Sequence, residues 1–161
     1  MKKIVIITLA LLIGAALSAQ QKGDTGIRLT TEYGTIMEAV SGILETLADA
    51  GIGVESVDME LGIVNGAVTS TKRATTTIQP RFLVTSKDGK ILITATGTGN
   101  AGASPTLAKT MGGNAVVQVV RDGQKGSILL SQWETLEELA LKVPHTEVKY
   151  INPNPPEKKR K

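Results

Sequence analysis

The hydrophobic positions of this chain follow two different spacings, and the first of them predicts a helix. Thr35-Ile-Met-Glu38 matches a capping box, in which the Thr oxygen accepts a hydrogen bond from one free amide of the first turn and the Glu reaches back to another. Apolar residues then recur every three or four positions: Ile36, Val40, Ile43, Leu44 and Leu47. Gly51 ends the pattern, as glycine often does at a helix C-terminus. We predict an amphipathic helix between Thr35 and Gly51, preceded by a short strand within residues 25–31.

Beyond Gly53 the spacing changes to two, which predicts strands with one polar and one apolar face. The alternating segments cover residues 56–61, 63–71, 78–85 and 91–95. The second contains Asn65-Gly66, which is typical of a turn or a bulge. Asp88-Gly89 separates the last two, and Asp-Gly between alternating segments is a strong signal for a β-hairpin. The middle of the chain is therefore predicted to be antiparallel sheet.

The C-terminal third contains a second predicted helix. Ser131-Gln-Trp-Glu134 again matches a capping box, apolar residues follow at helical spacing, and Pro144 ends the segment. Residues 97–113 are rich in Gly, Ala and Ser, with a short helix predicted after Ser104-Pro105. Residues 115–120 fit either a strand, which their valines favour, or one face of a helix, and we assign them to a strand.

These elements predict an α+β fold, with an antiparallel sheet of about four to six strands and two amphipathic helices packed on one face. The other face of the sheet is then left open. This element order, with the first helix bounded by Gly51 and Trp133 on the second, resembles the small TATA-binding-protein-like (helix-grip-like) domains of uncharacterised exported proteins of Gram-negative envelopes. The resemblance covers roughly Thr25 to Val143, and it implies a fold and no particular activity.

The two ends of the chain differ from its body. Lys2-Lys3, the apolar residues 4–17 and the small residues before Gln20 are typical of a cleaved secretory signal peptide. A helix of fourteen residues rises about 21 Å, short of the roughly 30 Å hydrocarbon core, which favours cleavage over a membrane anchor. We expect a signal peptide over residues 1–19 and one domain over residues 20–151, in a protein that is periplasmic or secreted and has no membrane span after cleavage.

Residues 152–161 contain three prolines and four consecutive basic residues, which predict a disordered, solvated tail. The basic residues Lys158–Lys161 could contact anionic envelope polymers. The alternative is that they only keep the protein soluble.

The composition narrows the chemistry further. The chain has no Cys, one His and four aromatic residues, so disulfides, thiolate metal sites and cysteine nucleophiles are excluded. Its formal charge is +3, but six of the 18 basic residues and one of the 15 acidic ones lie in the predicted signal and tail, which leaves the body at about −2. A mildly acidic body with few aromatic residues argues against a nucleic-acid partner.

One glycine pattern matches a cofactor motif. Gly97-Thr-Gly99-Asn-Ala-Gly102 fits the dinucleotide-binding pattern G-x-G-x-x-G, and Asp122 lies twenty residues after Gly102. That motif opens a parallel βαβ unit, whereas the strand before Gly97 belongs to the predicted hairpin. We therefore assign no cofactor, and we interpret the segment as a flexible loop that could form one edge of a binding surface.

Candidate catalytic groups are few and scattered. His145 is the only His, so it lacks partners for a metal site. Asp58 and Glu60 would share one face of a strand about 7 Å apart, a spacing that could hold a calcium ion or form an acid–base pair. Ser70-Thr-Lys72 spaces a Ser and a Lys as some catalytic dyads do. Each set also has an ordinary structural interpretation, so we assign no catalytic and no metal-binding residue.

Threonine is the most unusual feature of the sequence. Nine of the thirty residues from Thr69 to Thr98 are Thr, and Thr94, Thr96 and Thr98 alternate along one predicted strand. Alternating residues project from the same face, so these three would form a polar patch on the open side of the sheet. We take as the candidate binding surface the residues of this segment: Thr94, Thr96, Gly97, Thr98, Gly99 and Asn100.

The sequence therefore favours an exported, non-catalytic binding or assembly module of the cell envelope, whose partner would be an envelope protein or a glycan. The alternative is a small hydrolase or carbohydrate-active enzyme that uses carboxylates such as Asp58, Glu60 and Asp88. A third hypothesis is self-association through a sheet edge.

Overall fold

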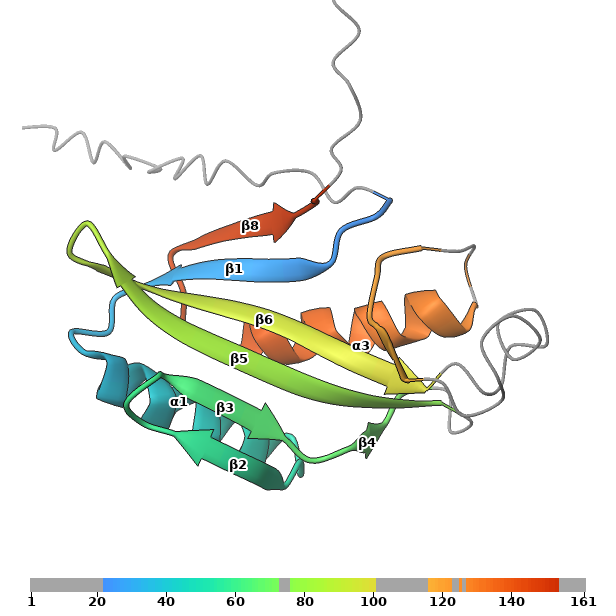
Figure 1. Cartoon of the computed structure of the whole chain (residues 1–161), viewed down its shortest axis with the longest axis horizontal. Helices are drawn as coiled ribbons and strands as arrows, with labels where there is room; N and C mark the ends of the chain where they lie inside the picture. Colours follow the sequence, from blue (N-terminus) through green and yellow to red (C-terminus); the bar gives the residue numbers. More distant parts are fainter. Residues whose placement is uncertain (1–21, 73–75, 101–115, 123–124, 126, 154–161) are drawn as a thin grey trace, which may run out of the picture.

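Over the residues that the structure describes, the fold is α+β, with one antiparallel sheet and two helices (Figure 1). The computed structural model describes residues 22–72, 76–100, 116–122, 125 and 127–153. Within those residues the strands are β1 (Gly26–Thr31), β2 (Val54–Asp58), β3 (Ile63–Gly66), β4 (Thr69–Ser70), β5 (Thr77–Lys87), β6 (Lys90–Asn100), β7 (Val116–Gln118) and β8 (Glu147–Ile151), and the helices are α1 (Ile36–Asp49) and α3 (Ile128–Lys142). The α+β class is confirmed, but the predicted four to six strands are too few, because the sheet has eight.

The strand order places the two ends of the domain next to each other. The sheet runs β2-β3-β5-β6-β1-β8, with β4 on β5 and β7 on β6, and every pair is antiparallel. Strand β8 follows the second helix and was not predicted. It pairs with β1 at the sheet edge opposite β2 (Figure 1). The predicted strand at 115–120 is present as β7, over Val116–Gln118.

Both helices cover the same face of the sheet. Each contacts β5 and β6, and the two helices contact each other behind the sheet (Figure 1). The core between the layers is built around the fully buried side chains of Trp133 and Phe82, with aliphatic residues from both helices and from the central strands. The opposite face has no covering element within the described residues, so alternate residues of the central strands remain open to solvent.

Helix α1 begins and ends as its sequence predicts. Thr35 Oγ1 accepts a hydrogen bond from the backbone N–H of Glu38 at 3.1 Å, and Glu38 Oε2 accepts one from the backbone N–H of Gly34 at 2.8 Å. Gly51 follows the helix with a φ of 69°, a conformation that glycine adopts without strain. The β5–β6 hairpin is likewise confirmed, with positive φ at both Asp88 and Gly89.

Helix α3 begins one turn earlier than predicted. Its N-cap is Ser127, whose Oγ accepts a hydrogen bond from the backbone N–H of Leu130 at 3.2 Å. The capping box predicted at Ser131 is therefore wrong, because Ser131 and Gln132 are buried inside the helix. Ser131 Oγ instead donates a hydrogen bond to Thr71 Oγ1 at 3.2 Å, across to the segment after β4.

The β2–β3 hairpin also departs from prediction. The alternating pattern predicted a strand as far as Leu61, but β2 ends at Asp58. Asp58 Oδ1 accepts hydrogen bonds from the backbone N–H groups of Glu60 at 3.1 Å and Leu61 at 2.9 Å, which closes a turn. A bulge lies in β2, between Val54 and Ser56, opposite Asn65-Gly66. The turn or bulge predicted at Asn65-Gly66 is therefore wrong, because the extra residue belongs to the partner strand and β3 ends at Gly66.

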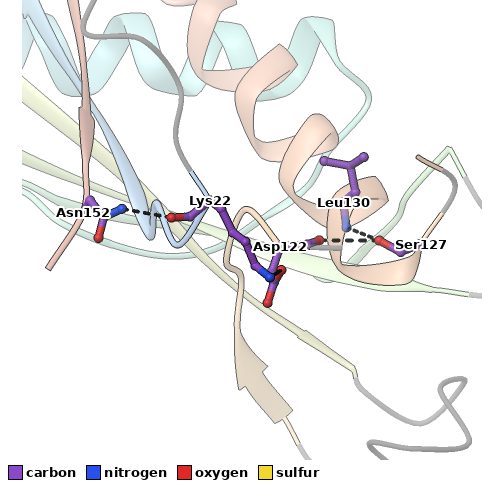
Figure 2. A network of polar contacts seen from close by, with 5 residues as sticks. All are labelled: Lys22, Asp122, Ser127, Leu130 and Asn152. Atoms are coloured by element: carbon purple, nitrogen blue, oxygen red, sulfur yellow. Dashed lines mark hydrogen bonds and ion pairs between the residues drawn. The ribbon is translucent and has the colours of Figure 1, made fainter. Parts of the chain in front are cut away.

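A polar network joins the two ends of the described chain (Figure 2). Asn152 Nδ2 donates a hydrogen bond to the carbonyl oxygen of Lys22 at 3.1 Å, and Lys22 Nζ lies 3.1 Å from Asp122 Oδ1. The carbonyl oxygen of Asp122 also accepts a hydrogen bond from Ser127 at 3.5 Å, next to the start of α3. The predicted signal peptide, the predicted helix after Ser104-Pro105 and residues 154–161 of the predicted tail lie outside the described residues. In the part of the chain described, no helix is long and apolar enough to cross a membrane.

Candidate functional site

The open face of the sheet carries two adjacent rows of polar side chains. In the first row, Gln118 of β7 pairs with Thr98 of β6, and Thr98 pairs with Gln79 of β5. In the second row, Thr96 of β6 pairs with Arg81 of β5, and Arg81 pairs with Asn65 of β3. Cross-strand partners project from the same face, so the two rows form a grid of amide, hydroxyl and guanidinium groups.

The bulge in β2 extends this grid by two residues. Ser56 accepts a hydrogen bond from Asn65 Nδ2 at 2.8 Å, and Glu55 accepts one from Gln79 Nε2. Consecutive residues of a regular strand point to opposite faces, but the extra residue of a bulge allows both to turn toward one face. Glu55 and Ser56 therefore lie at the far ends of the two rows.

Between these side chains lies a depression of about 540 Å³, which we call the polar groove. Its described lining consists of Glu55, Asn65, Gln79, Arg81, Thr96, Gly97, Thr98 and Gln118. No apolar side chain occurs in this set. The described lining therefore offers both hydrogen-bond donors and acceptors, together with one cation and one anion.

The six residues of the predicted binding surface divide between the two faces of β6. Thr94 and Thr96 are half-buried, and Thr98 and Asn100 are exposed, all on the open face as the alternation predicts. Gly97 and Gly99 are buried, and they face the helices instead. The predicted loop is thus a continuation of β6 to Asn100, where the first two glycines of the G-x-G-x-x-G pattern allow the strand to approach its neighbours closely.

A third row of side chains borders the polar groove. Lys149 of β8 pairs with Arg28 of β1, and Arg28 pairs with Thr94 of β6. Arg28 Nε donates a hydrogen bond to Thr94 Oγ1 at 3.5 Å. Arg28, Arg81 and Lys149 are exposed, and none of them takes part in an ion pair between described residues.

Sequence reasoning identified the threonines of the site but missed these cations and amides. The alternation predicted over residues 78–85 already directs Gln79 and Arg81 outward, and Arg28 lies in the same way between Ile27 and Leu29. Their proximity could not be predicted, since it depends on the order β8-β1-β6-β5 across the sheet.

The candidate carboxylates are not brought together around this groove. Asp58 caps the β2–β3 turn, Glu60 lies within that turn, and Asp88 occupies the β5–β6 turn. Within the described residues, no group of three or more His, Asp or Glu side chains could hold a metal ion. His145 Nδ1 lies 2.7 Å from the carbonyl oxygen of Val143, just beyond α3. The Asp58–Glu60 pair on one strand face is therefore a wrong prediction.

A second depression, of about 310 Å³, lies between β4 and α3. On its rim, Lys72 Nζ lies 2.8 Å from Glu138 Oε2. The hydrogen bond from Lys72 and its charge lower the pKa of Glu138, and the same hydrogen bond raises the pKa of Lys72. Lys72, whose spacing from Ser70 is that of some catalytic dyads, thus forms an ion pair with Glu138 of α3.

No family model matches this chain, and none of the curated proteins shows significant similarity to it.

Proposed function

We propose that this chain is an exported, non-catalytic binding module of the cell envelope, and that the polar groove on the open sheet face is its binding site. The observation that carries this proposal is the groove itself, where seven side chains from five strands present hydrogen-bonding groups to solvent in one depression. Arg81 lies at its centre, exposed and without an ion-pair partner among the described residues. Its guanidinium group therefore retains its hydrogen-bonding capacity for a partner.

The groove supports binding better than catalysis. Its one lining carboxylate, Glu55, accepts a hydrogen bond from Gln79, and Asp58 is occupied by two backbone amides of its turn. An acid–base pair made of two carboxylates needs both of them directed at one substrate position. The carboxylates of the enzymatic alternative, Asp58, Glu60 and Asp88, instead lie in two separate turns, so no specific observation favours that alternative.

Export is the second part of the proposal and rests on the sequence of residues 1–19. The resemblance to helix-grip-like envelope domains supports the same exported location. Export stays a prediction. The expected partners are an envelope protein or a glycan, both of which display many hydrogen-bonding groups.

Blocking the groove tests the proposal. Thr98→Trp places a large side chain in the groove at an exposed strand position, where the fold has room for it. Thr85→Trp is the matched control. Thr85 of β5 is exposed on the same face of the sheet as Thr98, but it does not line the groove. Each chain, starting from Gln20, is tested for saturable binding to fractionated envelope glycans and proteins. We expect the Thr98 variant to lose binding and the Thr85 variant to keep it.

Two results would count against the proposal. The first is binding that Thr98→Trp leaves unchanged, which would place the site elsewhere. The second is turnover of an envelope polymer that disappears in Glu60→Ala or Asp88→Ala, which would favour the enzymatic alternative.

A further inference from the structure

In the row Lys149–Arg28–Thr94 two positive charges repel each other, and no described residue neutralises them with an ion pair. Lys149 and Arg28 lie directly opposite each other on β8 and β1, and both are exposed. Like charges in direct cross-strand contact destabilise a sheet. Neither side chain forms an ion pair with another described residue. Glu147 is on the same face of β8, but its Oε2 accepts a hydrogen bond from Thr30 at 3.4 Å.

A bound anion over this row would offset the repulsion between Lys149 and Arg28. Lys149 offers an ammonium group, Arg28 a guanidinium group and Thr94 a hydroxyl, all from neighbouring strands about 4.8 Å apart. Hydrogen bonds from charged donors to an anionic oxygen are stronger than neutral ones, and an arginine can engage two oxygens at once. The row thus has the donor set of a site for a carboxylate, phosphate or sulfate group.

Arg81 provides a second cation on the same face. It lies across β6 from Arg28, displaced by two residues along the strand, because Arg28 pairs with Thr94 and Arg81 with Thr96. Strand spacing and rise put their Cα atoms about 12 Å apart. The hydroxyls of Thr94 and Thr96 lie between the two arginines, so the cationic row continues into the polar groove.

The scarcity of accessible rings limits how a sugar could be held here. Phe82 and Trp133 are fully buried, Tyr150 packs against Trp133, and Tyr33 packs against Gly42 of α1. None of the four aromatic residues of the chain therefore offers a stacking platform on this face. Neutral hydrogen bonds to a ligand contribute less net free energy in water than charge-assisted ones, so the cations of this face are its stronger source of affinity.

We propose that the open face binds an acidic glycan, with an anionic substituent on Lys149, Arg28 and Thr94 and the hydroxyl groups of the sugar chain in the polar groove. This inference rests on the proposed function and specifies its ligand. The alternating amide and hydroxyl groups of the groove favour a polyhydroxylated chain over an acidic peptide or a lipid headgroup. The anion could be a carboxylate, a phosphate or a sulfate, which offer the same oxygen acceptors.

The test uses defined probes and the chain purified after export. We would measure, by isothermal titration calorimetry at low and at physiological salt, the binding of tetragalacturonate, of its sulfated and phosphorylated analogues, of neutral maltotetraose and of a tetraglutamate peptide. We expect an acidic tetrasaccharide to bind at least tenfold more tightly than either maltotetraose or tetraglutamate, and more weakly as salt rises. Comparison of the carboxylate, sulfate and phosphate probes then identifies the anion.

Variants separate this site from a general charge effect. Lys149→Glu and Arg28→Gln should each weaken binding of the acidic tetrasaccharide about tenfold, which is typical of losing a charge-assisted hydrogen bond. Lys90→Glu makes the same charge change as Lys149→Glu. It also lies opposite a lysine, Lys87, but at the hairpin end of β6, four residues from Thr94. It should change affinity less than twofold.

The melting temperature of Lys149→Glu distinguishes a binding role of Lys149 from a purely structural one. Because Lys149→Glu replaces repulsion of Arg28 by attraction, the free variant should unfold about 1–2 °C higher than the parent chain at low salt, although it binds the probe more weakly. A lower melting temperature would mean that Lys149 stabilises the fold. It would contradict the repulsion between Lys149 and Arg28 on which the inference rests.

The outcomes distinguish failure of the inference from failure of the proposed function. Equal binding of maltotetraose, unaffected by Arg28→Gln but abolished by Thr98→Trp, would overturn the anionic subsite and keep the groove as a binding site. Tighter binding of tetraglutamate would make the ligand an acidic peptide and overturn the glycan. No binding of any probe would overturn the acidic glycan, and the envelope-fraction experiment would then decide on the groove.

Discussion

Gln132 of α3 occupies the space that a side chain at Gly99 of β6 would need. A Cβ atom built on Gly99 would lie 2.3 Å from Gln132 Nε2. The same Nε2 donates hydrogen bonds to the carbonyl oxygens of Thr77 at 3.1 Å and Asn100 at 3.2 Å. The fully buried Gln132 thus ties the helix layer to β5 and β6 directly behind the polar groove.

We predict that Gly99→Ala destabilises the protein by about 1–3 kcal/mol, because the added methyl group forces a buried side chain or the strand to shift. Chemical denaturation followed by tryptophan fluorescence would measure the change. Gly53→Ala is the control, since its added Cβ would meet only ordinary contact at 3.5 Å with Ala67. It should change the free energy of unfolding much less.

A double-mutant cycle assigns the effect to Gln132. Shortening Gln132 to Ala removes the colliding atoms, so Gly99→Ala should cost less in that background than in the parent chain. Additive costs would show that the strain at Gly99 arises from another contact.

The start of α3 provides a second prediction. Ser127→Ala removes the N-cap hydrogen bond to Leu130 and should lower the free energy of unfolding by about 1 kcal/mol. If the helix instead began at Ser131, as the capping-box pattern predicts, Ser127 would lie in a loop and the substitution would be nearly neutral. Equilibrium denaturation of the single variant therefore decides between the two starting points.

The Lys72–Glu138 ion pair predicts a dependence of stability on pH. The hydrogen bond from Lys72 lowers the pKa of Glu138 in the folded chain, so the contribution of Glu138 is present above its unfolded pKa and is lost as pH falls through its folded pKa. The pKa of Lys72 is raised by the same bond, so its contribution is lost as pH rises through its folded pKa. Both side chains are exposed, so the effect is small.

Lys72→Met tests this directly. The melting temperature of the parent chain should exceed that of the variant at neutral pH, and the difference should shrink below about pH 4, where free glutamate protonates. A difference that stays constant down to pH 3 would show that Lys72 contributes through its alkyl chain alone. Lys142→Met is the control, because Lys142 Nζ is 3.9 Å from Glu138 and should contribute less.

Short sequence patterns correctly predicted the parts of this fold that depend on contacts within a few residues. The capping residues of α1 and the Asp88-Gly89 turn determine their geometry through contacts within a few residues, so the sequence pattern was sufficient. The start of α3 was mispredicted because tertiary contacts of Ser131 and Gln132 outweigh a local capping pattern. Strand β8 is a short segment whose partner, β1, lies more than a hundred residues away in sequence.

The candidate site was predicted only in part, for the same physical reason. Alternation along β6 was enough to direct Thr94, Thr96 and Thr98 outward. It does not say which strands flank β6, and therefore could not bring Arg28 and Lys149 from one side, and Arg81 from the other, around those threonines.

If the open sheet face is a binding surface, a probe should bind there, and mapping where it binds tests this without a substitution. Titration of isotope-labelled chain with tetragalacturonate would be followed through the NMR signals of the Gln79, Gln118 and Asn65 side-chain amides and the Nε–H groups of Arg28 and Arg81. We expect these signals to shift together and saturate, while the signals of the Lys72–Glu138 region between β4 and α3 do not change. Shifts confined to that second region, or to the helix layer, would contradict this expectation.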